Sequence, residues 1–258
     1  MTTVHVPTTL ASALDLLGDG GRPVGGGVGL SLLRRDTGLA GVLVATHRLP
    51  ETRGIAATDD GLRIGAGEPL EAVAAHPIVR SLWTVVAEAA ASVATGRIRR
   101  AATLGGNVAA FDTSHDPPVA LAVVGATARL SGPRGERVVP VRDLTELLSG
   151  ELIVDFHLPA PVPGTGSAYE KFLVRGVWEY ACVSTAAVVT PAGATLAIGS
   201  VHNAPLVLPV TDDDTAAEAA AVTGEPWSDV RGSAAYKRRM IAEFSRRALR
   251  AARRRAHA

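Results

Sequence analysis

One glycine-containing segment constrains this chain more than any other part of the sequence. It runs from Arg97 to Asp116 and reads RIRRAATLGGNVAAFDTSHD. Its centre, Thr103-Leu104-Gly105-Gly106-Asn107, predicts a tight loop whose backbone N–H groups no side chain obstructs. Such N–H groups can cradle a phosphate, and the Thr103 hydroxyl and the Asn107 amide add donors on either side. The segment therefore predicts an anion-binding loop.

A second glycine-rich loop lies near the N-terminus. It reads Gly25-Gly26-Gly27-Val28-Gly29-Leu30 and follows a strand expected near Val24. Two such loops in one small chain suggest a diphosphate held from two sides, as in a dinucleotide. The loop is not a P-loop, because no Gly-Lys-Ser/Thr follows it, and it lacks the G-x-G-x-x-G register of a Rossmann fingerprint. Taken alone, either loop also fits an ordinary chain reversal.

Composition narrows the class of protein. Of 258 residues, 47% are hydrophobic and 20% charged, which is typical of a globular chain of one or two domains. A formal net charge of +1 gives no general attraction to nucleic acid or to an anionic membrane. No run approaches the roughly 20 apolar residues of a membrane span. The N-terminus shows no signal-peptide pattern, so we expect a cytoplasmic protein.

The cysteine and histidine content argues against a metal site built by this chain. Cys182 is the single cysteine, whereas an iron–sulfur cluster needs about four cysteine ligands. Its neighbours Ala181 and Val183 favour a small buried residue. The seven histidines show no metal-ligand spacing. No side chain stands out as an acid–base catalyst either.

Three segments are predicted, over 1–54, 55–164 and 165–258, and the Pro/Gly cluster at 159–166 is the clearest boundary. The first is expected to be βαβ-like, with a helix over 10–17 capped by Thr8 or Thr9, strands near Val24 and over 42–45, and a helix containing Leu30, Leu32 and Leu33. The second should contain a hairpin of 55–57 with 62–64, helical structure over 69–94, a helix over 119–124, and strands over 126–130, 137–141 and 152–158. The third should contain strands over 167–173, 181–190 and 194–200, then helices over 214–222 and 233–255.

Several polar and aromatic residues have two interpretations at this stage. Arg97, Arg99 and Arg100 either contact phosphate or form an exposed basic turn. Asp116 fits a helix cap, and Lys171 and Arg175 fit the solvent face of a strand. Trp178 and Tyr180 either stack on a ring system or belong to the core. The arginines of the C-terminal helix form a solvated face or a surface for a partner protein; they are Arg246, Arg247, Arg250 and Arg253–Arg255.

Read together, these segments resemble the FAD-binding medium subunit of the molybdenum hydroxylases, the xanthine dehydrogenase and carbon monoxide dehydrogenase group. The resemblance covers nearly the whole chain. Its elements are the loop Gly25–Leu30, then RAATLGGN from Arg100 to Asn107, then Asp116 with an apolar run, then YEKFLVR from Tyr169 to Arg175, then Tyr180-Ala181 and finally AAYK from Ala234 to Lys237. The order and spacing of all these elements make the resemblance specific.

The resemblance implies an α+β fold of the vanillyl-alcohol-oxidase type, in which two α/β subdomains hold FAD and a C-terminal α+β subdomain completes the site. The two glycine loops would bind the pyrophosphate, and Asp116 and Lys171 would lie along the flavin or its ribityl chain, with Ile153 and Val93 nearby. The cofactor-binding residues expected on this basis are Val24, Gly25, Gly26, Gly27, Val28, Gly29, Leu30, Thr103, Leu104, Gly105, Gly106, Asn107, Asp116, Ile153 and Lys171.

The implied function is electron transfer. A large subunit with a molybdenum cofactor would oxidise the substrate and pass the electrons to [2Fe-2S] clusters of a small subunit. FAD would take the electrons from these clusters and pass them to an external acceptor. The resemblance implies a dimer of heterotrimers. One alternative is a free-standing flavin oxidoreductase, for which His115 and His157 are the candidate bases. The other is a structural subunit without FAD, because Val28 and Gly29 stand where the family usually has Thr and Asp.

Overall fold

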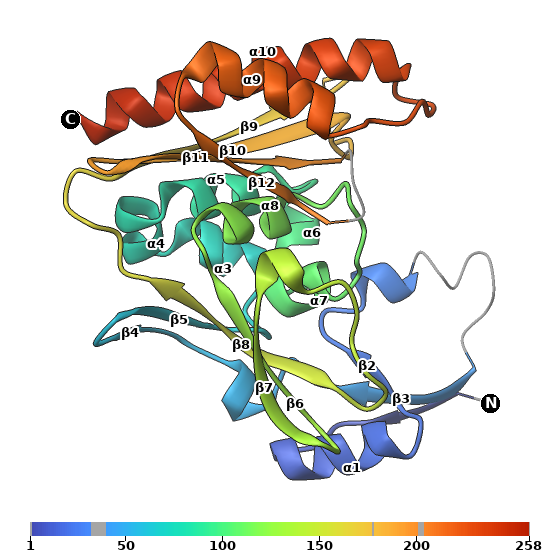
Figure 1. Cartoon of the computed structure of the whole chain (residues 1–258). Helices are drawn as coiled ribbons and strands as arrows, with labels where there is room; N and C mark the ends of the chain where they lie inside the picture. The colour runs from blue at the N-terminus through green and yellow to red at the C-terminus, as the bar shows by residue number, and fades with distance from the viewer. Residues whose placement is uncertain (1, 32–39, 177, 201–203, 258) are drawn as a thin grey trace.

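The computed structural model describes residues 2–31, 40–176, 178–200 and 204–257. Figure 1 shows helices and sheets in alternating layers, which confirms the predicted α+β class. A four-stranded sheet with two long helices on its outer side lies at the top, a group of short helices lies beneath it, and a five-stranded sheet follows. A small three-stranded sheet stands at the opposite end. Each sheet falls within one of the three predicted segments, whose limits stay a prediction.

The small N-terminal sheet is parallel, in the order β1-β3-β2. The helix predicted over 10–17 is confirmed as α1, and the Thr9 side chain caps it by accepting a hydrogen bond from the N–H of Ser12. Residues 28–31 are helical, as the sequence predicted, while Leu32 and Leu33 lie outside the described residues. Strand β1 was not predicted, because all its residues are exposed and give no hydrophobic signal. The elements are β1 (Thr2–His5), α1 (Leu10–Gly18), β2 (Arg22–Val24) and β3 (Gly41–Ala45).

The five-stranded sheet is antiparallel, in the order β4-β5-β8-β6-β7. It confirms the predicted hairpin of 55–57 with 62–64, and the strands predicted over 126–130 and 137–141 pair with each other. The central strand β8 carries Asp155, which is buried between Arg63 of β5 at 2.8 Å and Arg129 of β6 at 2.5 Å. Strands and adjoining 3-10 turns are η1 (Pro50–Thr52), β4 (Ile55–Thr58), β5 (Gly61–Gly65), β6 (Thr127–Gly132), β7 (Gly135–Pro140), η2 (Val141–Asp143) and β8 (Leu152–Pro159).

The helical structure predicted over 69–94 is confirmed, and it is divided into three helices. Pro77 lacks an N–H and begins a new helix, and Trp83 leaves the helical conformation while its indole N–H donates to the carbonyl of Pro159. The apolar pattern continues across both breaks because all three helices bury residues in one core. The helices of this layer are α3 (Leu70–Ala75), α4 (Pro77–Leu82), α5 (Thr84–Ser92), α6 (Gly96–Ala101), α7 (Leu104–Val108) and α8 (Asp116–Val123).

The C-terminal sheet is antiparallel, and helices pack against both of its faces. Its inner face contacts α5 and α8, and its outer face is covered by α9 and α10 (Figure 1). The predicted strands and helices are confirmed, and β12 is an additional edge strand. The elements are β9 (Gly166–Phe172), β10 (Val183–Thr190), β11 (Gly193–Gly199), β12 (Leu206–Val210), α9 (Asp213–Thr223) and α10 (Ala234–Ala256).

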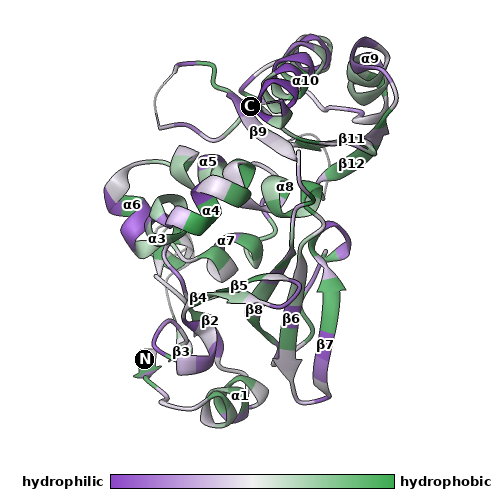
Figure 2. Cartoon of the chain, turned by 90° about the vertical axis from the view of Figure 1, so that its left-hand side faces the viewer, coloured by the Kyte–Doolittle hydropathy of each residue, from purple (hydrophilic) through white to green (hydrophobic). Residues whose placement is uncertain are grey.

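Several arginines of the helix α10 form ion pairs with other parts of the same chain. Arg246 pairs with Asp214, Arg253 pairs with Asp213, and Arg255 pairs with Glu88 of α5. Figure 2 shows hydrophilic residues along α10, as expected of a helix with one solvated face. A partner surface on the remaining exposed arginines stays a prediction. Among the described residues, no helix has the length and the apolar character that a membrane span needs.

Phe156 is fully buried at the centre of β8, in the core shared by the five-stranded sheet and the short helices. Phe156→Ala should therefore lower the free energy of unfolding by about 3–5 kcal/mol. Val138→Ala is the matched control, because Val138 lies on the edge strand β7 with 62% of its surface exposed. We expect it to change the free energy by no more than about 0.5 kcal/mol. Urea denaturation of the three proteins measures both, and equal losses would contradict this account of the core.

Candidate functional site: a cofactor cavity

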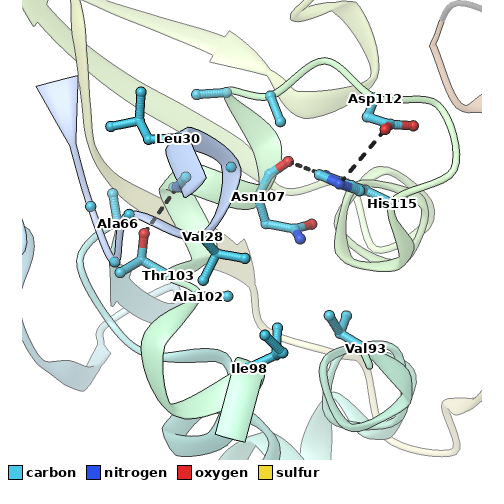
Figure 3. Close-up of a pocket in the computed structure, with 18 of the residues that line it drawn as sticks. Val28, Leu30, Ala66, Val93, Ile98, Ala102, Thr103, Asn107, Asp112 and His115 are labelled. Atoms are coloured by element: carbon cyan, nitrogen blue, oxygen red, sulfur yellow. Dashed lines mark hydrogen bonds and ion pairs between the residues drawn. The ribbon is translucent and has the colours of Figure 1, made fainter. Parts of the chain in front are cut away.

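One large cavity, of about 740 Å³, lies where the three segments meet. This volume is within the roughly 300–1,000 Å³ of typical ligand pockets. Its walls come from the loop after β2, from the residues that follow α5, from α6 and α7, from the start of α8, and from the end of β9 with the residues that follow it. Figure 3 shows Val28, Val93, Ile98 and Asn107 around the same central space. The cavity therefore depends on segments far apart in the sequence.

The first glycine loop presents free backbone donors to this cavity. Gly25, Gly26 and Gly27 connect β2 to the helical turn that begins at Val28, and all of them line the cavity. Their N–H groups make no hydrogen bond to any described part of the chain. Free N–H groups at a strand-to-helix junction form an anion site. The prediction of a phosphate cradle fits this loop.

Close packing brings the two predicted glycine elements together. A Cβ on Gly26 would lie 1.5 Å from the carbonyl oxygen of Ala101, and one on Gly25 would lie 2.5 Å from Oγ1 of Thr103. Gly27 has a φ of +72°, which L side chains rarely adopt. Glycine is thus required here for contact and for backbone conformation, and the loop rests directly on the segment that begins with Thr103.

Leu104–Val108 forms a short helix, α7, so the loop with unobstructed N–H groups predicted over 103–107 is wrong. Thr103 caps the helix by accepting from the N–H of Gly106 at 3.1 Å. The N–H of Leu104 donates to Glu68, and that of Gly105 donates to Ala66. Leu104 is fully buried and does not line the cavity. These backbone donors are already used, so this segment supplies its surface and its side chains instead.

Asn107 is the polar side chain that α7 directs into the cavity. It is 8% exposed, and its Oδ1 is buried without a hydrogen-bond partner among the described residues. In Figure 3 the amide extends towards the space beside Val28 and Ile98. A buried polar atom without a partner costs about 1–3 kcal/mol. A ligand with hydrogen-bonding groups would satisfy it.

A buried ion pair forms another part of the cavity wall. Asp116 begins α8, Lys171 lies near the end of β9, and Oδ2 and Nζ are 2.8 Å apart. The two side chains are 4% and 9% exposed, respectively, and both residues line the cavity. Asp116 is not the helix cap, because His115 occupies that position. Lys171 is not on a solvent face. The interpretation of Asp116 as a helix cap and that of Lys171 as a solvent-face charge are therefore both wrong.

Tyr169 belongs to the same group, although the sequence did not mark it as a site residue. Its hydroxyl donates to Oδ1 of Asp116 at 2.5 Å. Burial, followed by the negative charge of Asp116, raises the pKa of Tyr169 well above its usual value. The phenol therefore stays protonated near neutral pH. The spacing of two between Tyr169 and Lys171, which places them on one face of a strand, is the signal that sequence analysis overlooked.

Aromatic side chains form the rim of the cavity. Trp178 is 72% exposed and Tyr180 44% exposed, so assigning them to the core is wrong. The rings of Tyr180 and His115 stack at 5.8 Å, and the guanidinium of Arg231 lies 5.8 Å from the Tyr180 ring. The Nδ1–H of His115 donates to the Asn107 carbonyl at 2.8 Å, since a carbonyl can only accept. His115 thereby connects the rim to α7 (Figure 3).

The remaining candidates lie away from the cavity. Arg97, Arg99 and Arg100 are on α6 and do not line it, and Arg99 pairs with Glu71 at 2.8 Å. Arg175 is exposed and pairs with Glu179, as expected of a solvent-face charge. All the predicted cofactor-binding residues other than Leu104 do line the cavity, as does Val93.

No group of three or more metal-ligating side chains occurs in the part of the chain that the structure describes. Cys182 is buried as predicted, and burial raises the pKa of its thiol.

The cavity has free N–H groups at one wall and a buried lysine at another, and α+β units enclose it. These features are those of a protein that binds an anionic nucleotide cofactor. The chain matches the family model "FAD binding domain in molybdopterin dehydrogenase" over residues 1–161. It therefore belongs to the FAD-binding medium subunits of the molybdenum hydroxylase family. It is an oxidoreductase subunit, and its cofactor is FAD.

Known relatives agree with this assignment over the whole chain. The chain is 32% identical to the carbon monoxide dehydrogenase medium chain of Afipia carboxidovorans, over 98% of this chain and 96% of that one. It is 31% identical to the xanthine dehydrogenase FAD-binding subunit of Escherichia coli O157:H7, over 71% and 66%. Among solved structures, carbon monoxide dehydrogenase from Hydrogenophaga pseudoflava matches with a TM-score of 0.91 and 30% identity, over 98% of both chains. The predicted FAD-binding fold is confirmed.

The residues present fit FAD. The free N–H groups of Gly25–Gly27 suit a pyrophosphate, the Oδ1 of Asn107 lacks a partner, and Lys171 supplies a buried cation. Val28 and Gly29 differ from the Thr and Asp usual in the family. Val28 packs its side chain against the core while lining the cavity. Because loss of one hydroxyl donor costs about 0.5–1.5 kcal/mol, we expect this difference to weaken FAD binding and not to abolish it.

Gly26→Ala should disrupt the cavity, because its new Cβ would overlap the Ala101 carbonyl oxygen at 1.5 Å. Forced repacking costs about 1–3 kcal/mol, so we expect FAD to bind roughly 5- to 150-fold more weakly. Gly18→Ala is the matched control, since Gly18 lies on α1 away from the cavity and the nearest atom to the position of its Cβ is 4.0 Å away. Its Kd for FAD should change less than about twofold. Fluorescence titration of the apoprotein with FAD measures both values, and equal Kd values for the two variants would contradict the close contact.

Proposed function

We propose that this chain is the electron-transfer subunit of a molybdenum hydroxylase complex. It would take electrons from [2Fe-2S] clusters of a partner chain and pass them to an external acceptor. The observation that carries the proposal is the buried Asp116–Lys171 pair, which places a fixed cation on the wall of the FAD cavity. FAD supplies the redox chemistry, since it exchanges electrons with both one-electron and two-electron partners.

The protein's part is to bind the cofactor and to set its electrostatics. Negative charge accumulates at a flavin on reduction, and a nearby ammonium stabilises developing negative charge. Lys171 is suited to this role, because its side chain is largely shielded from water and its Nζ is fixed by Asp116 at 2.8 Å and by the carbonyl of Ser92 at 3.3 Å. The low local dielectric makes the charge more effective than it would be in water.

The chemistry that this chain lacks defines its partners. Cys182 is the single cysteine, so iron–sulfur clusters must be on another chain. We assign them to a small [2Fe-2S] subunit and assign substrate oxidation to a large subunit with a molybdenum cofactor, assembled as a dimer of heterotrimers. A solved Cu,Mo-CO dehydrogenase, which this chain resembles at 30% identity with a TM-score of 0.91, contains molybdenum.

The proposal is tested by loading the purified chain with FAD and mixing it anaerobically with the chemically reduced [2Fe-2S] subunit. Rapid loss of the visible flavin absorption would support electron transfer between the chains. A flavin that dithionite reduces but the [2Fe-2S] subunit does not would contradict it. Turnover of an organic substrate by this chain alone would favour a free-standing oxidoreductase. A chain that assembles with its partners but takes up no FAD would favour a structural subunit.

Lys171→Met should shift the reduction potential of bound FAD to a more negative value, because the fixed cation is lost while Asp116 remains. Breaking one side of a buried pair should also lower the free energy of unfolding by about 3–5 kcal/mol. Arg175→Met is the matched control, since it removes an exposed cation four residues further along. Potentials measured with equilibrating dyes should be the same for the control and the wild type. An unchanged potential in Lys171→Met would remove this role from Lys171.

A further inference from the structure

Behind the ion pair on the cavity wall lies a third polar group, the hydroxyl of Tyr169. Tyr169 does not line the cavity, and its side chain reaches Asp116 from the same strand, β9, that carries Lys171. The Asp116 carboxylate is thus shared by two donors. Tyr169 contacts Oδ1 at 2.5 Å, while Lys171 contacts Oδ2 at 2.8 Å.

The backbone around Tyr169 is itself held in place. Its N–H donates to Oε2 of Glu88 on α5 at 2.9 Å, and Arg255 of α10 donates to the same carboxylate. Two residues earlier, the hydroxyl of Ser167 accepts from the N–H of Val85. Strand β9 is therefore fixed against α5 on the side of Tyr169, so the phenol reaches Asp116 from a rigid support.

The phenol acts as a donor in this arrangement. Burial and the negative charge of Asp116 raise the pKa of Tyr169, so the phenol keeps its proton near neutral pH, and a carboxylate can only accept. Charge-assisted O–H···O⁻ bonds are short and strong, typically about 2.5–2.7 Å. With one oxygen engaged by Tyr169, the carboxylate of Asp116 cannot rotate freely, and its second oxygen keeps one direction towards Lys171.

We propose that Tyr169 is a positioning residue that fixes the Lys171 ammonium on the wall of the FAD cavity through Asp116. The inference rests on the proposed role of Lys171 and extends it to a residue that does not touch the cavity. Without the phenol, one oxygen of a buried carboxylate loses its donor, Asp116 reorients, and the ammonium is displaced from the position in which it stabilises charge in the cavity.

A double-mutant cycle tests the proposal, because it separates an effect exerted through Lys171 from an independent one. The proteins are wild type, Tyr169→Phe, Lys171→Met and the double variant, with the FAD Kd and the reduction potential measured for each. Loss of one hydrogen bond should raise the Kd of Tyr169→Phe roughly two- to tenfold and make the potential more negative. Adding Tyr169→Phe to Lys171→Met should change neither value further.

Tyr236→Phe is the control for removing a phenol hydroxyl. The Tyr236 ring contacts Phe172 next to Lys171, but the residue does not line the cavity. Its Kd and potential should equal those of the wild type. Thermal unfolding of every variant identifies any loss of folded protein, and the potential is read only from the folded, FAD-bound fraction.

Two results would overturn the inference. Tyr169→Phe with wild-type Kd and potential would show that the phenol does not position Lys171, while the FAD site itself would stand. Equal effects of Tyr169→Phe in the presence and absence of Lys171 would assign its influence to the fold alone. A wild-type chain that binds no FAD would overturn the proposed function and this inference together.

Discussion

The functional architecture of this protein depends on the contact between Asp116 and the strand β9. Asp116 begins α8, in the middle segment of the chain, whereas Lys171 and Tyr169 belong to the C-terminal sheet. The ion pair and the phenol hydrogen bond join these units at the wall of the cavity. A buried pair of charges is costly unless its geometry and its remaining hydrogen bonds are satisfied. Here both carboxylate oxygens have donors, so the cavity gains a fixed cation.

Another part of the cavity wall depends on the glycine residues of the loop after β2. Gly26 lets the loop after β2 approach the carbonyl oxygen of Ala101 more closely than any side chain allows. The free N–H groups of that loop then face the cavity from the N-terminal unit. Backbone donors and a buried lysine thus line one cavity from different units. A binding site between units requires all of them to be packed together.

Local signals in the sequence were sufficient for much of the fold. The hairpins of the five-stranded sheet, the cap at Thr9 and the helix that begins at Asp116 follow from turn residues, capping residues and periodicity. One predicted helical segment is divided into three helices, and one predicted loop is helical, for reasons that lie in packing. Pro77 and Trp83 divide a helical pattern that stays periodic because all parts face one core. The Gly105-Gly106 pair is helical because its N–H groups find acceptors at Thr103 and Ala66.

By itself, the sequence determined the α+β class, the family and the choice of FAD, because these depend on motifs that are each contained in a short stretch of chain. The tertiary structure decided which groups remain free to act. It used the donors of α7 internally, left those of Gly25–Gly27 unpaired, and placed Tyr169 behind the ion pair. Whether a polar group binds a ligand depends on whether another part of the protein has already satisfied it. Contacts between residues such as Tyr169 and Asp116, far apart in sequence, settle that question, and spacing along the chain does not encode them.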